Sequence, residues 1–156
     1  MKQAQRAARL RERRRIDVDA CMEMLRHGAI LTKYAAHKEG EKQRRWVALA
    51  ASGAEIGWCA PHRRVFTSTL RLADVTGVGI GAASPVFQSA TEQPGDARRC
   101  FTLYSSERSY DFECAERDDA IAWVFAVRCL LLERAGTGRY ALSKVVVRLE
   151  SASLGL

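Results

Sequence analysis

From position 28 onward, apolar residues occur in short runs that are rich in β-branched and aromatic side chains. Turn-forming Gly, Pro, Ser and Asp separate these runs, a pattern that predicts strands. Because no helical periodicity lies between the runs, we expect an antiparallel barrel or sandwich. A long polar loop is predicted at 81–98. The predicted strands cover 29–36, 44–51, 55–60, 65–72, 75–80, 99–104 and 110–114.

The segment 118–134 has the periodicity of an amphipathic helix. Its acidic start suits the positive end of a helix dipole, and Gly136 follows its predicted end. A second apolar row lies on the opposite side, so another segment must cover it, either an N-terminal helix or the tail 140–149. The first row comprises Trp123, Val127, Leu130 and Leu131, and the second comprises Ile121, Phe125, Cys129 and Leu132.

Residues 2–26 are predicted to form a further helix, because good helix formers dominate and neither Gly nor Pro interrupts them. Its second half has apolar positions that can dock on a body, whereas its first half has too few. The first 15 residues contain seven basic residues and one acidic residue, so they carry six of the seven net positive charges. We therefore divide the chain into a basic helical arm (1–26), a barrel domain (27–135) and a tail (136–156) whose β-prone stretch predicts an added strand.

Several classes of function find no support in the residues. No apolar run is long enough to span a membrane. The five cysteines form no C-x-x-C pair, and no Cys/His cluster has ligand spacing. We therefore expect buried thiols in a reducing compartment, no metal and no cofactor. The glycines at 77–81 are expected in a strand and turn, because no βαβ unit surrounds them. Without a nucleophile motif or paired carboxylates, we expect no enzymatic activity.

The order and spacing of these elements resemble the pleckstrin-homology (PH) domain over roughly residues 25–134, most closely the phospholipase C-delta and ELMO-like type. The resemblance implies a mainly β fold. The expected architecture is a PH-like seven-stranded antiparallel barrel of two nearly orthogonal sheets, capped by a C-terminal α-helix, with an extra N-terminal basic helix. The matching stretches are Gly28-x-x-Leu31-x-Lys33, Arg44–Leu49, Glu55–Trp58, Leu72–Gly81, Phe87, Cys100–Leu103, Arg108–Phe112 and Ala122–Val124.

PH domains grip inositol phosphates in a basic mouth formed by the first two strands and their loop. Lys supplies point charges there, and Arg supplies paired donors that suit phosphate oxygens. The resemblance assigns these roles by position in the first strand, in its loop, before the aromatic residue of the second strand, and after the third strand. The implied phosphoinositide- or anion-binding residues are Lys33, Lys38, Lys42, Arg45, His62, Arg63 and Arg64.

Four positions depart from the family pattern. Gln43 stands where strong phosphoinositide binders keep a basic residue, and Ala35 replaces a second basic residue of the first strand. Glu39 and Glu41 bring negative charge to the mouth. Because each departure lowers the expected affinity for a headgroup, two functions stay open. One is a module that recruits the protein to phosphoinositides or an anionic membrane surface. The other is a signalling or cytoskeletal scaffold module that binds a protein or self-associates through its helix faces.

The basic arm leaves further alternatives open. Its charge would attract anionic lipid, nucleic acid or an acidic filament, or it is only the solvated end of a longer helix. Nucleic acid is the least favoured partner, because no aromatic residues are interleaved for base stacking. A mitochondrial targeting peptide is a further alternative, because Arg is abundant and acids are few, but the absence of Ser from this segment argues against it. We expect a cytoplasmic protein with peripheral membrane or cytoskeletal association. The residues of this electrostatic arm are Arg9, Arg11, Arg13, Arg14 and Arg15.

Overall fold

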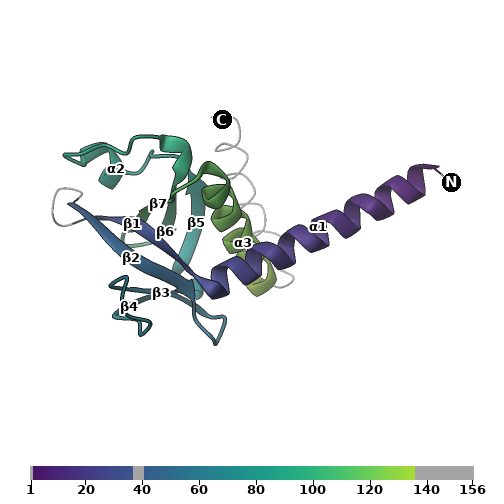
Figure 1. Ribbon diagram of the computed structural model, residues 1–156, viewed down its shortest axis with the longest axis horizontal. Helices are drawn as coiled ribbons and strands as arrows, with labels where there is room; N and C mark the ends of the chain where they lie inside the picture. The colour runs from purple at the N-terminus through teal and green to yellow at the C-terminus, as the bar shows by residue number, and fades with distance from the viewer. Residues whose placement is uncertain (1, 37–40, 136–156) are drawn as a thin grey trace.

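The computed structural model describes residues 2–36 and 41–135, with the backbone alone for 10–18 and 135. A long helix comes first, strands follow, and a second long helix ends the described chain (Figure 1). The elements are α1 (Lys2–His27), β1 (Ala29–Ala35), β2 (Glu41–Leu49), β3 (Glu55–Cys59), β4 (Ser68–Arg71), η1 (Leu72–Asp74), β5 (Val75–Ile80), α2 (Pro85–Ser89), η2 (Ala97–Arg99), β6 (Cys100–Ser105), β7 (Ser109–Glu113) and α3 (Arg117–Ala135).

The strands of the described residues form one seven-stranded antiparallel sheet in the order β4-β3-β2-β1-β7-β6-β5. β1 joins the two halves, because it pairs with β2 along one edge and with β7 along the other. The sheet curls around a core, and its end strands β4 and β5 are linked through η1. This arrangement confirms the predicted mainly β fold with a C-terminal and an N-terminal helix.

The helix α3 closes one end of the curled sheet with the apolar face that its periodicity predicts. Trp123 and Val127 are fully buried, and the Trp123 ring stacks on Phe101 with 5.6 Å between ring centroids. Phe101 in turn stacks on Phe112 of β7 at 5.3 Å. These large apolar surfaces lose their contact with water on folding, which is the main favourable term in forming the core.

Two strand starts differ from the prediction by three residues, and one predicted loop contains a helix. β2 begins at Glu41 instead of 44, because its polar first residues pair with β1 over the full length of that strand. β4 begins at Ser68 instead of 65, and Val65 is exposed in the preceding loop. The predicted loop 81–98 contains α2. Ser84 caps α2 by accepting a hydrogen bond from the Phe87 N–H, and Pro85 occupies its first turn.

The segment from α2 to η2 covers the outer face of β1, the face turned away from the core. The ring of Phe87 packs on Tyr34 with 4.8 Å between centroids, and both side chains are fully buried. Beneath this cover, the buried carboxylate of Asp111 accepts hydrogen bonds from the hydroxyls of Ser84 and Thr102. Outward-facing residues at this end of β1 are therefore enclosed by protein.

The second apolar row of α3 is only partly covered. The end of α1 packs beside α3, where Leu25 is fully buried. A groove of about 370 Å³ between the two helices is lined by Cys21, Ile121 and Phe125, among others, and Ile121 is 48% exposed. The predicted covering strand in the tail lies outside the described residues.

The thiols and helices bear on the classes of function considered above. Cys59, Cys100, Cys114 and Cys129 are free thiols, and burial raises the pKa of Cys100 and Cys114 to about 12. Among the side chains that the structure describes, no three of His, Cys, Asp or Glu gather as metal ligands would. None of the described helices is both long and apolar enough to cross a membrane.

Asp96 joins the covering segment to the start of α3, and its pairing predicts acid sensitivity. Its carboxylate accepts 2.8 Å and 3.0 Å hydrogen bonds from Arg117 and the Arg98 N–H, which lower its pKa from 3.8 to about 2. Because the folded state binds this proton less tightly, the stabilisation is present above pH 3.8 and lost toward pH 2. Urea midpoints should fall over that range less steeply in Asp96→Asn than in the wild type. Equal slopes would contradict the pairing.

Candidate functional site

The alternation of side chains along β1 and β2 sorts their cations onto two faces. Leu31 is buried on the inner face that lines the core, so Lys33, two residues later, lies on the same face. The register pairs Leu31 with Arg45 and Lys33 with Gln43, which places Arg45 and Gln43 on the inner face as well. The structure therefore brings two of the predicted site residues, Lys33 and Arg45, to one face.

Lys33 lies close to the end of β1 that leads into the β1–β2 connection, and its side chain is only 8% exposed. Its ammonium lies 5.7 Å from the centroid of the Trp58 ring. No hydrogen bond or ion pair to this ammonium occurs among the described residues. Burial is the largest cause that lowers the pKa of Lys33, followed by repulsion from Arg108; attraction to Asp111 partly opposes them, and Arg45 adds repulsion.

Arg45 is held by its neighbours on β2. One guanidinium nitrogen donates a 2.9 Å hydrogen bond to the side-chain oxygen of Gln43, and another donates at 2.9 Å to the Arg44 carbonyl. Because a guanidinium has five N–H donors, this arrangement leaves others for an external acceptor. Gln43, a departure from the family pattern, thus acts here as a positioning residue for Arg45.

Arg108 belongs to this cluster although it was not among the predicted site residues. It is exposed in the turn between β6 and β7, and its guanidinium lies 4.4 Å from the centroid of the Tyr110 ring. Tyr110 packs against Trp58 at 5.5 Å, and Trp58 also contacts Lys33. We call Lys33, Arg45 and Arg108 the mouth cluster. It has an aromatic floor and lies at the end of the barrel where β1 ends and β7 begins.

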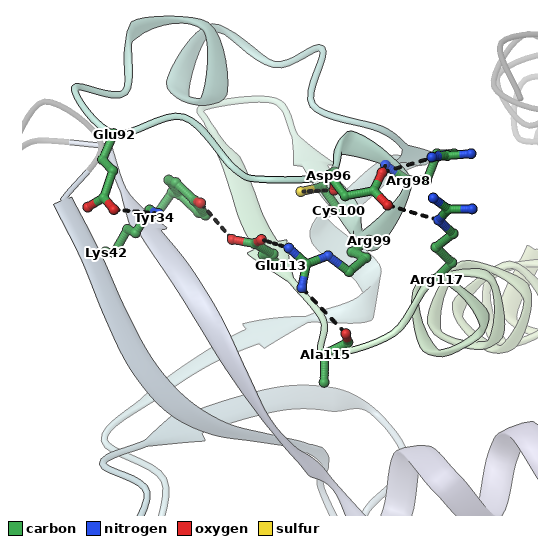
Figure 2. Close-up of polar contacts among 10 residues, drawn as sticks. All are labelled: Tyr34, Lys42, Glu92, Asp96, Arg98, Arg99, Cys100, Glu113, Ala115 and Arg117. Atoms are coloured by element: carbon green, nitrogen blue, oxygen red, sulfur yellow. Dashed lines mark hydrogen bonds and ion pairs between the residues drawn. The ribbon is translucent and has the colours of Figure 1, made fainter.

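The structure does not bring Lys42 into the mouth cluster. Lys42 pairs with Tyr34, so its side chain lies on the outer face of the sheet. There its ammonium makes a 3.4 Å ion pair with Glu92, which Figure 2 shows as a dashed line. The same ammonium lies 5.7 Å from the centroid of the Tyr34 ring. The sequence could not reveal this direction, because the start of β2 was predicted three residues too late.

The same outer face holds a partly buried polar network next to Lys42 (Figure 2). The Tyr34 hydroxyl donates a 2.7 Å hydrogen bond to Glu113, whose other oxygen accepts from Arg99 at 3.0 Å. Burial, followed by the hydrogen bond to Glu113, raises the pKa of Tyr34 well above its ordinary value. These groups satisfy one another, so this face offers a structural network instead of a cationic site.

The predicted basic run after β3 is also separate from the mouth cluster. His62, Arg63 and Arg64 are exposed in the β3–β4 loop. The Arg64 guanidinium lies 4.7 Å from the centroid of Trp46, an outer-face residue that also stacks on Phe66 at 5.5 Å. Arg64 also donates a 2.7 Å hydrogen bond to the Pro61 carbonyl. The Arg64 side chain therefore lies on the outer face, away from the mouth cluster.

Of the remaining predicted residues, Lys38 and Glu39 lie outside the described residues. Arg9 is exposed on α1, and Arg11, Arg13, Arg14 and Arg15 lie in the part of α1 that is described by its backbone alone. Glu41 is exposed at the start of β2, and its register opposite Ala35 puts it on the inner face, next to Gln43. Glu41 therefore shares the strand face of the mouth cluster.

Searches of family models and of curated proteins yielded no match to this chain. Solved structures do match. Sub-compartment Protein 1 of the Toxoplasma gondii inner membrane complex has a TM-score of 0.57 at 12% identity, covering 74% of this chain and 90% of that one. The N-terminal PH domain of human ARAP2 has a TM-score of 0.52 at 16% identity, covering 70% and 82%.

A third match, PLC21 of S. officinalis, has a TM-score of 0.53 at 14% identity and covers 69% of this chain but only 16% of the enzyme. The likeness therefore involves a small part of that enzyme. At these identities the comparisons bear on the fold alone. The seven-stranded sheet, the capping helix α3 and the PH domains among the matches agree: this chain has the pleckstrin-homology fold.

Proposed function

We propose that this chain is a non-enzymatic PH module whose mouth cluster binds a phosphoinositide headgroup and so recruits the protein to a membrane. The observation that carries the proposal is Lys33. Lys33 is a buried residue beside two arginines, and no carboxylate among the described residues pairs with its ammonium. A buried charge is costly unless it is paired, and a phosphate group would supply the missing partner.

The chemistry of the cluster suits clustered phosphates. Lys33 supplies a point charge, whereas Arg45 and Arg108 can each present paired donors to phosphate oxygens. The aromatic floor of Trp58 and Tyr110 holds two of these cations in place. Gln43 and Glu41 reduce the positive charge compared with an all-basic mouth, so we expect moderate affinity.

The alternative function is a scaffold module that binds protein. The groove between α1 and α3 supports it, because Ile121 and Phe125 present apolar surface there. Association with a second copy of the chain through this groove would give a concentration-dependent mass in light scattering without any binding of lipid. The mouth cluster favours the lipid-binding function, because an apolar contact at the groove would leave the Lys33 ammonium without a partner among the described residues.

Removing two of the three cations of the mouth cluster should abolish most headgroup binding. Titration calorimetry with a soluble inositol phosphate should show that Lys33→Ala combined with Arg45→Ala weakens binding by roughly a hundredfold, since each charge-assisted hydrogen bond contributes about 1.5–3 kcal/mol. Sedimentation with vesicles containing the matching phosphoinositide should show the same loss. Binding of the soluble anion without vesicle binding would indicate that a free phosphate compound is the ligand.

A matched control removes two cations from the outer face. Lys42→Ala combined with Arg64→Ala changes the net charge equally, but both side chains lie away from the mouth cluster. The affinity for the soluble inositol phosphate should therefore stay within about twofold, which is well below 1 kcal/mol. If both double variants lose affinity equally, the attraction is a general effect of net charge and the proposed site is wrong.

The titration of Lys33 provides an independent check of the cluster. Because repulsion from Arg108 contributes to the lowered pKa of Lys33, Arg108→Ala should raise that pKa toward 10.5. Binding of an inositol phosphate should raise it as well, since a nearby anion favours the charged ammonium. NMR of the lysine side-chain methylene groups against pH can measure both shifts. Arg64→Ala should leave the Lys33 titration unchanged, and an equal shift in that control would argue against a local cause.

A further inference from the structure

The helix α1 leaves the barrel at the end opposite the mouth cluster. Gly28 connects α1 to the first residue of β1, whereas Lys33 lies near the last residues of β1 and Arg108 lies beside them in the β6–β7 turn. Figure 1 shows α1 extending away from the sheet on one side, whereas the last residues of β1 and the first residues of β2 lie on the other side. A flat membrane surface that contacts the mouth cluster therefore does not also contact the N-terminal end of α1.

The conformation of Gly28, its close packing and the burial of Leu25 fix this direction. Gly28 has a φ of 78°, a conformation that favours glycine, and its N–H donates a 2.9 Å hydrogen bond to the Met24 carbonyl, which ends the helix. A Cβ at Gly28 would lie only 2.7 Å from the Trp46 ring nitrogen. Leu25 is fully buried and anchors the last turns of α1 in the core. Because Gly28 and Leu25 are both closely packed, α1 cannot turn back toward the mouth cluster without losing these contacts.

The arm has the length and charge to form a contact of its own. With 26 residues, α1 is about 39 Å long. Residues 2–9 are exposed throughout, including Lys2, Arg6 and Arg9. The spacing of these three residues and Arg13 places four basic positions on one face of the helix. No acidic residue occurs before Glu12.

We infer that the arm binds a second anionic lipid surface while the mouth cluster holds the first, so that one molecule bridges two bilayers. The bridging rests on the proposed function of the mouth, but the lipid binding of the arm does not. A straight basic row matches a flat layer of negative headgroups, which attracts basic residues close to it. The arm lacks aromatic side chains for stacking on bases, and this favours lipid over nucleic acid.

Two vesicle populations can test the bridge. The first contains phosphatidylcholine with phosphatidylinositol bisphosphate and carries one dye, and the second contains phosphatidylcholine with phosphatidylserine and carries another. At near-physiological salt, the full chain should bring both dyes into the same clusters. Arg6→Gln, Arg9→Gln and Arg13→Gln together should weaken capture of the second population by roughly a hundredfold, because each basic residue near anionic lipid contributes about fivefold. Gln keeps the helix propensity high.

A matched control separates the arm from net charge. Arg26→Gln, Arg71→Gln and Arg134→Gln remove three exposed cations elsewhere and should leave bridging intact. If the arm variant instead loses binding to the first population as strongly as the mouth variant does, arm and mouth share one surface and the inference is wrong. Arm-dependent binding of an RNA or DNA duplex without capture of phosphatidylserine vesicles would overturn it too.

The two proposals fail in different ways. If the Lys33→Ala and Arg45→Ala variant binds the first population as well as the wild type does, the proposed function of the mouth is wrong, while arm-dependent capture of the second population would still support the lipid contact of the arm. If the mouth binds as expected but the two dyes never meet in one cluster, the bridge alone is wrong.

Discussion

Successive side chains of a strand point to opposite faces of a sheet, and this alternation decides which cations of the chain can meet. Lys33 and Arg45 share the inner face because the register places them diagonally across β1 and β2. Lys42, next to Gln43 in the chain, lies on the other face and pairs with Glu92. Shifting β2 against β1 by a single residue would exchange these roles, so the candidate site depends on the register of one strand pair.

The register in turn depends on what covers the outer face. Tyr34 is completely buried beneath Phe87, and its hydroxyl is hydrogen-bonded to Glu113. Turning this side of β1 inward would place the phenol in the core and expose Leu31 to water, at a large cost in buried apolar surface. The cover formed around α2 therefore supports the mouth cluster indirectly, although it does not contribute a cation to it.

Much of the fold could be predicted from the sequence, because periodicity alone locates strands and amphipathic helices. Trp123 was expected in the core from its spacing with Val127, and both are fully buried. The direction of Lys42 could not be predicted, since a polar strand start such as Glu41 has no apolar alternation to reveal it. Arg108 was not predicted as a site residue for another reason. Only the pairing of β7 with β1 brings the β6–β7 turn, which is distant in sequence, beside Lys33.

The joint at Gly28 has a consequence for distance. A rigid helix that leaves a body in one fixed direction acts as a spacer, and its length then sets how far apart its two ends hold whatever they touch. Each residue added to α1 before the docked turns would lengthen this spacer by about 1.5 Å and rotate its basic row by about 100°. Only insertions that restore the helical phase, such as seven residues, would keep that row on nearly its present side while widening the separation by about 10 Å.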